Sequence, residues 1–256
     1  MQPSAGILSD FNEEAVRVVN QAQQSGILLR LMGATAIMGH CPKSRHLFGS
    51  LGRSLTDLDF MTYGKYRGKL EKFFVNLRYR SDRRTSYYFG ESRHRYFDDV
   101  NNRVVDIFFD KLAFCHTIDF SGRLELDNPT ITLSDLLLEK MQIVEINEKD
   151  IKDTVIMLRE HEIQNGEKEY LNAQYVAKLL SNDWGFYYTV TTNLRKVKSY
   201  LDLFTVLSDE DRKDVGSKVD TLLKAIENEP KSMKWQMRAK VGTRKRWYTE
   251  VETFKH

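Results

Sequence analysis

The spacing of hydrophobic and polar positions changes about half-way along the chain. Up to about residue 126, short apolar runs typical of strands alternate with short helical segments. After Asn128-Pro129 a helical spacing dominates, and its clearest apolar stripe consists of Leu133, Leu136, Leu137, Met141 and Val144. The pattern predicts a mixed α/β domain over residues 1–128 and an all-α half over residues 129–256.

Local signals place individual elements. Asp10 is suited to cap a helix over residues 13–24, and residues 28–32 are expected to form a strand. Residues 69–77 have the pattern of a helix, whereas residues 87–89 and 95–97 are expected to be short strands. In the second half, the expected helices are 132–146, 148–158, 173–180, 187–207 and 209–227.

Two carboxylates in the apolar run Leu55-Thr56-Asp57-Leu58-Asp59-Phe60 are the strongest chemical signal. Residues two apart on a strand share one face, so Asp57 and Asp59 are expected to project together. Two like charges held this close repel each other unless a cation lies between them. Mg²⁺ suits the position because it takes carboxylate ligands and keeps coordination positions for phosphates.

A third carboxylate lies inside a later strand-like run, residues 102–110. Asp106 is flanked by Val105 and Ile107, where an unpaired carboxylate is costly unless it has a partner or binds a metal. Asp110, at the end of the same run, has the simpler interpretation of an edge residue facing water.

A tight turn between the first expected strand and the following helix is a candidate phosphate site. Gly33 can adopt a positive φ and allows a phosphate to approach the backbone closely. The N-terminus of the helix that follows, at Ala34 and Thr35, would offer N–H groups to an anion.

In this order, the motifs resemble the nucleotidyltransferase (polymerase-beta-like) superfamily, and within it the AbiEii-type nucleotidyltransferases. The resemblance rests on the turn at Gly33, Arg53 four residues before the Asp57/Asp59 pair, and Asp106. It continues in Asp135-Leu136-Leu137-Leu138-Glu139-Lys140 and in Lys149-Asp150-Ile151-Lys152-Asp153, so that it covers residues 28–158.

The resemblance implies a nucleotidyltransferase fold and transfer of a nucleoside monophosphate from an NTP, such as ATP, to a hydroxyl group. Asp57, Asp59 and Asp106 would hold two Mg²⁺ ions, which Mn²⁺ can replace, and Asp106 would act as general base. Gly33, Ala34, Thr35, Arg53 and Lys140 would bind the nucleotide, with the charge of Lys140 directed to the triphosphate. The resemblance leaves RNA (including tRNA), a protein or a small molecule as acceptor, and implies a toxin with a partner antitoxin.

Two positions depart from the family pattern. Ala34 stands where the family has a second glycine, and Leu55 stands where a hydroxyl residue is expected. Both leave the predicted metal ligands in place. A catalytically degenerate nucleotide- or RNA-binding module on the same fold is therefore one alternative to the enzyme. A purely structural α/β protein with incidental acidic pairs is another.

Composition and charge add fewer constraints. The sequence has no apolar run that approaches the ~20 residues of a membrane span. Met1 to Asn12 lacks the pattern of a secretory signal. The two cysteines, Cys41 and Cys115, form no disulfide or zinc-binding pattern, so a cytoplasmic protein with reduced thiols is expected.

The net charge of +3 is unevenly distributed. Residues 231–256 carry eight Lys/Arg against two Glu, a net charge of +6, mixed with Trp235, Trp247 and Tyr248. A second basic cluster consists of Arg78, Arg80, Arg83, Arg84, Arg93 and Arg95. Cations mixed with aromatic side chains suit RNA or single-stranded nucleic acid, although such clusters are also common on solvated surfaces.

Overall fold

The computed structural model describes residues 6–250. The predictions made for residues 1–5, within the N-terminal segment, and for residues 251–256, at the end of the basic tail, lie outside it. The described chain forms two compact units. The first contains residues 6–39, 54–112 and 119–132, and the second contains residues 40–53, 113–118 and 133–250. The chain passes for the last time from the first unit to the second between Thr132 and Leu133. The boundary predicted between residues 128 and 129 lies four residues earlier, within the first unit.

The first unit is built on a mixed sheet of five strands in the order β1-β2-β5-β4-β3. The strands are β1 (Leu29–Met32), β2 (Asp57–Thr62), β3 (Arg80–Ser81), β4 (Arg93–Asp98) and β5 (Arg103–Phe109). Strand β2 is antiparallel to β1 and parallel to β5, and β4 is antiparallel to both β5 and β3. The predicted mixed α/β class is confirmed for this part of the chain.

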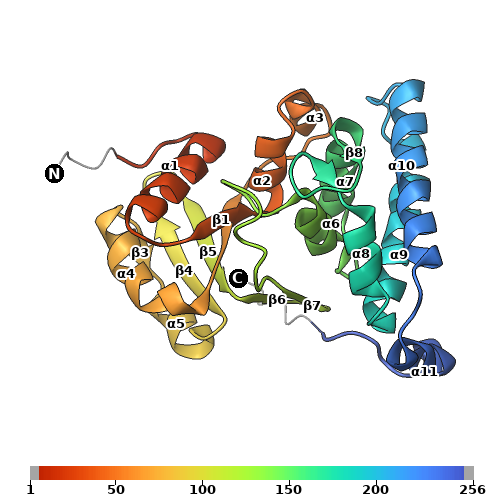
Figure 1. The fold of residues 1–256 in the computed structure, drawn as a ribbon. Helices are drawn as coiled ribbons and strands as arrows, with labels where there is room; N and C mark the ends of the chain where they lie inside the picture. The colour runs from red at the N-terminus through yellow and green to blue at the C-terminus, as the bar shows by residue number, and fades with distance from the viewer. Residues whose placement is uncertain (1–5, 251–256) are drawn as a thin grey trace. The chain divides into compact units, whose positions relative to one another are not determined.

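Helices α1 (Phe11–Gln24) and α4 (Arg67–Asn76) pack beside this sheet (Figure 1). The predicted cap of α1 is confirmed, since the Asp10 side chain accepts a hydrogen bond from the Glu13 N–H. Phe74 of α4 stacks on Tyr96 of β4 with ring centroids 4.4 Å apart. Tyr79, which follows α4, donates a hydrogen bond to the Glu14 carboxylate of α1. This bond links the end of α4 to α1.

One predicted strand of this unit is wrong. Tyr87–Phe89, expected as a strand, forms the end of helix α5 (Arg83–Phe89). The Asp82 side chain accepts hydrogen bonds from the Arg84 and Thr85 N–H groups and so caps the helix. This local cap outweighs the β propensity of the three aromatic residues, which are exposed rather than packed between strands.

The second unit is mainly helical. Its helices are α3 (Arg45–Ser50), α6 (Leu133–Met141), α7 (Glu148–Glu160), α8 (Ala173–Leu180), α9 (Trp184–Tyr200), α10 (Asp209–Asn228) and α11 (Met233–Val241). Helix α10 packs against α7, α8 and α9. Two short parallel strands, β8 (Glu162–Ile163) and β9 (Tyr170–Leu171), interrupt the helices. The prediction of an all-α half over residues 129–256 therefore misses these two strands.

The segment 40–53 belongs to the second unit because α7 binds it in several places. The Glu160 carboxylate accepts the Lys43 and Ser44 N–H groups at 3.1 and 2.7 Å. Arg159 donates to the Ser44 hydroxyl at 2.9 Å. Arg53, at the end of the segment, forms an ion pair with α7 that is described below.

The chain also enters the second unit briefly around the hairpin of β6 (Lys111–Ala113) and β7 (Thr117–Asp119). Cys115 of this hairpin and Cys41 are both buried and form no disulfide. Among the helices within residues 6–250, none combines the length and the apolar character needed to cross a membrane.

Candidate functional site

Strand β2 presents the predicted carboxylate pair on one face of the sheet. Leu58 and Phe60 are fully buried, whereas Asp57 is exposed and Asp59 is half-buried. This is the expected alternation of a strand, with apolar residues on the covered face and carboxylates on the other. Thr56 donates a hydrogen bond to Asp57 Oδ1 at 3.2 Å.

Strand β5 brings the third predicted carboxylate to the same face. Asp106 is the register partner of Asp59 in the parallel β2–β5 pair. Register partners on neighbouring strands project from the same side of a sheet, so Asp57, Asp59 and Asp106 share one face. Asp106 is only 3% exposed, as its position in an apolar run predicts.

Two arginines of β4 bind Asp106. Arg95 Nε and Nη2 donate to its two carboxylate oxygens at 3.0 and 3.3 Å. Arg93 Nε donates to Oδ1 at 2.8 Å, and Arg93 Nη2 donates to Oδ2. Burial lowers the pKa of Arg95, but the hydrogen bonds to Asp106 and the charges of Asp106, Asp82 and Asp59 together raise it above its ordinary value.

The predicted turn lies beside the carboxylate pair. Gly33 has φ +72° and begins helix α2 (Gly33–His40). A Cβ atom at this glycine would lie 2.7 Å from Asp59 Oδ2, so the absence of a side chain is what admits the carboxylate. Ala34 and Thr35 are buried behind the turn, and the Thr35 hydroxyl donates to the Asp57 carbonyl oxygen at 3.4 Å.

Replacing Gly33 by Ala tests this close approach. Any L residue at a positive φ costs about 1–2 kcal/mol. At Gly33 the new methyl group would also push against Asp59, which adds about 1–3 kcal/mol. The matched control is Gly26→Ala, because Gly26 has φ +67° with nothing near a Cβ. Urea unfolding should show a larger loss of stability for Gly33→Ala, and equal losses would contradict the clash.

Arg53 and Lys140 lie in the second unit, in a buried network of charges. Arg53 Nε and Nη2 donate to the two oxygens of Asp153 at 2.8 and 3.0 Å. Lys140 Nζ lies 3.3 Å from Asp153 Oδ2, 3.4 Å from Asp150 Oδ1 and 3.7 Å from Glu139 Oε1. Burial raises the pKa of Asp150, opposed by the nearby ammonium of Lys140.

The structure therefore groups the predicted site residues in two sets. Gly33, Ala34, Thr35, Asp57, Asp59 and Asp106 belong to the first unit, and Arg53 and Lys140 belong to the second. Sequence reasoning did not assign Arg93 and Arg95 to the carboxylates. Their spacing could have suggested a shared role, because two arginines two residues apart on a strand project from the same face.

No protein-family model matches this chain, and no curated protein is significantly similar to it.

The carboxylate face offers the type of ligand that a divalent metal needs, but one of its three carboxylates, Asp106, is bonded to arginines. Oxygen ligands on one face are what Mg²⁺ requires, and Asp57 and Asp59 provide them. The oxygens of Asp106 accept hydrogen bonds from Arg93 and Arg95 instead. Within residues 6–250, no three His, Cys, Asp or Glu side chains are arranged closely enough to hold a metal ion.

The basic and aromatic residues predicted as a nucleic-acid surface fall into two places. In the C-terminal segment, Trp235 packs edge-on against Tyr187, and Trp247 packs against Tyr188 and donates to the Thr189 hydroxyl at 3.1 Å. These tryptophans therefore pack against α9. On α5, by contrast, no residue is buried, and Tyr87 and Tyr88 are 83% and 71% exposed.

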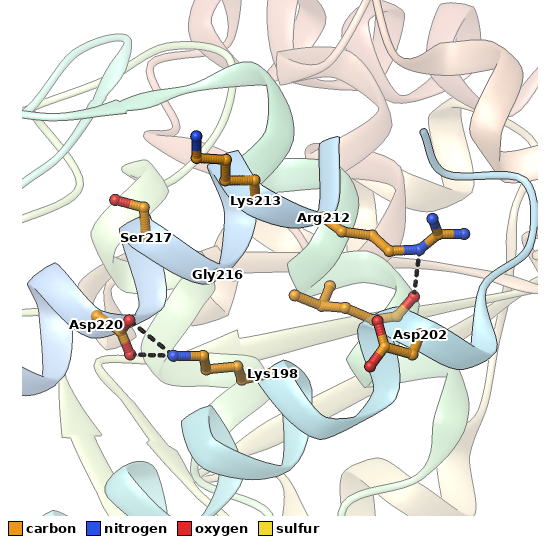
Figure 2. A pocket seen from close by; sticks show the side chains of 8 residues that line it. Lys198, Asp202, Arg212, Lys213, Gly216, Ser217 and Asp220 are labelled. Atoms are coloured by element: carbon orange, nitrogen blue, oxygen red, sulfur yellow. Dashed lines mark hydrogen bonds and ion pairs between the residues drawn. The ribbon is translucent and has the colours of Figure 1, made fainter. Parts of the chain in front are cut away.

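A polar hollow in the second unit contains none of the predicted site residues. It lies between the end of α9 and α10, and Figure 2 shows Lys198 facing Asp220 at one end and Arg212 at the other. Lys198 Nζ bonds both Asp220 oxygens at 2.7 Å, and Arg212 donates to the Leu201 carbonyl. Its charges are thus largely paired within the protein.

Proposed function

We propose that this chain is a Mg²⁺-dependent nucleotidyltransferase that moves a nucleoside monophosphate from an NTP to a hydroxyl acceptor. One observation carries the proposal: Asp57, Asp59 and Asp106 share one face of two adjacent parallel strands, beside the turn at Gly33. The mixed sheet that presents them is consistent with the family resemblance. RNA, a protein or a small molecule remains as acceptor.

Asp57 and Asp59 would hold Mg²⁺, joined by Asp106 once Arg93 and Arg95 release it, and the ion would neutralise the triphosphate and favour ionisation of the acceptor hydroxyl. Asp59 Oδ2 takes the space where a Cβ of Gly33 would lie, so the turn holds this carboxylate against the start of α2. Helix α2 begins at this turn, and the N-terminus of a helix is a favourable position for an anion such as a phosphate. Asp106 would accept the proton of the attacking hydroxyl. Positioning the acceptor and the nucleotide beside each other would lower the remaining activation barrier.

Arg53 and Lys140 enter the proposal less directly. Both side chains are engaged with Asp153 in the second unit, and a role for them in triphosphate binding rests on the family resemblance alone. The resemblance to AbiEii-type enzymes adds the proposal of a cytoplasmic toxin whose activity a partner antitoxin restrains.

Pyrophosphate release tests the proposed reaction. Each of the four NTPs is incubated with the protein, Mg²⁺ and one acceptor pool at a time: RNA, a mixture of proteins, or an aminoglycoside. We expect release with one pool and its loss when EDTA removes the metal. Release that continues in EDTA would contradict the metal-dependent mechanism.

A specific observation favours a second candidate, the non-catalytic RNA-binding module. The exposed tyrosines of α5 lie beside Arg83 and Arg84, which are also exposed. Residues 78–95 contain six arginines against Asp82 and Glu91, a net charge of +4. Bases stack on exposed aromatic rings and phosphates pair with arginine, so this surface is suited to single-stranded RNA.

Fluorescence anisotropy with a labelled oligouridine tests the α5 surface. Each stacked base is worth about 1–3 kcal/mol, so Tyr87→Ala/Tyr88→Ala should weaken binding at least 10-fold. Arg83→Ala/Arg84→Ala should weaken binding and also reduce its salt dependence. The control is Lys213→Ala/Lys224→Ala, which removes two exposed charges from α10. Equal effects of the two charge variants would exclude a specific surface on α5.

A further inference from the structure

The two arginines on Asp106 exceed what one buried carboxylate needs. Asp106 accepts four guanidinium hydrogen bonds, two from each arginine, which occupy the acceptor positions of its two oxygens. Arg95 also interacts electrostatically with Asp82 and Asp59. A metal ion could use an Asp106 oxygen only if at least one of these guanidinium groups moved away.

A second ion pair on the same strands shows what a purely structural pair looks like. Arg103 of β5 pairs with its register partner Asp98 of β4, and their side chains are 2% and 0% exposed. The remaining N–H groups of Arg103 donate to the backbone carbonyls of Leu8, Ser9 and Asp10. In this pair one arginine neutralises one carboxylate, and both side chains are buried.

The Asp106 group differs in both respects. The Arg93 and Arg95 side chains are 30% and 17% exposed, although the carboxylate between them is only 4% exposed. The Arg93 guanidinium also lies over the Phe108 ring, with its central carbon 5.2 Å from the centroid. A soluble anion can therefore approach the arginines from the solvent side without unfolding the sheet.

We infer that Arg93 and Arg95 bind the triphosphate of the nucleotide, and that they occupy Asp106 until the nucleotide arrives. This inference rests on the proposed function. A guanidinium group binds phosphate in the same forked geometry as it binds carboxylate, and a triphosphate offers several such positions. When the phosphates take over the arginines, the Asp106 oxygens become available to the metal.

The consequence is coupled binding of metal and nucleotide. Without nucleotide, Arg93 and Arg95 occupy the oxygens of Asp106, so metal binding is weak. With nucleotide, the third carboxylate joins. Because coupling between two ligands is reciprocal, the metal must strengthen nucleotide binding by the same factor.

Calorimetric titration of Mn²⁺ with and without α,β-methylene-ATP tests the inference by binding alone. In the wild-type chain, we expect the analogue to tighten Mn²⁺ binding at least 10-fold. In Arg93→Gln/Arg95→Gln, Mn²⁺ without the analogue should bind several-fold more tightly. The analogue should bind at least 10-fold more weakly to this variant, and the coupling should fall towards 1.

Single variants protect the test against misfolding. A buried carboxylate without a partner is destabilising, so Arg93→Gln and Arg95→Gln are each measured as well, since each keeps one guanidinium group on Asp106. Circular dichroism melts verify that every variant is folded. Each single variant should shift both affinities in the same directions as the double variant, by smaller factors.

Two failures can be told apart. If the wild-type chain shows coupled binding and the arginine variants keep the wild-type affinities, the arginines are purely structural and this inference is wrong. If the wild-type chain binds the analogue neither with nor without Mn²⁺, the proposed function itself is wrong and the inference falls with it.

Discussion

Replacing Asp153 by Ala should lower the free energy of unfolding by about 3–5 kcal/mol, because two buried cations would lose their shared carboxylate. The Asp153 side chain is fully buried, and those of Arg53 and Lys140 are 8% and 10% exposed. Asp153→Asn keeps the shape and one acceptor oxygen, so a smaller loss is expected. Urea unfolding at neutral pH measures both.

A surface ion pair on the same helix provides the control. Glu148 and Lys152 of α7 are four residues apart, and their carboxylate and ammonium groups lie 2.6 Å apart. The Glu148 side chain is 60% exposed, and pairs of this kind contribute about 0.3–0.5 kcal/mol. Glu148→Ala should therefore have little effect. If Asp153→Ala has as little, the network does not hold the second unit together.

Asp59→Asn and Asp106→Asn should each reduce pyrophosphate release at least 100-fold. Both substitutions keep side-chain size but remove the negative charge that the proposed metal requires. Asp99→Asn is the matched control, since Asp99 follows β4 and pairs with Arg80 at the surface. Release that survives in either site variant, with the control unchanged, would contradict a catalytic role for that carboxylate.

Local signals in the sequence predicted most elements of the first unit. The cap at Asp10, the strand before Gly33 and the alternation of apolar and acidic residues on β2 each depend on neighbouring residues only. The prediction was wrong at Tyr87–Phe89, where aromatic residues typical of strands end a capped helix. Their exposure explains the error, because β propensity reflects packing that α5 does not have.

Contacts between distant segments account for what the sequence could not predict. Asp59 and Asp106 are register partners because β2 pairs with β5 in parallel, and no local pattern encodes that choice of neighbour. The same holds for Arg53, which is 100 residues from Asp153 in the sequence. Arg93 and Arg95 were recognised as basic, but their bonds to Asp106 depend on the β4–β5 register.

Calorimetric titration of the four NTPs, with and without Mg²⁺, is the most direct test of a metal-dependent nucleotide site on Asp57 and Asp59. The wild-type chain is compared with Asp57→Asn/Asp59→Asn, which changes charge but not shape. We expect binding of at least one NTP that requires both the metal and the carboxylate pair. Absence of binding in the wild-type chain under every condition, or binding that neither metal removal nor the double variant affects, would contradict it.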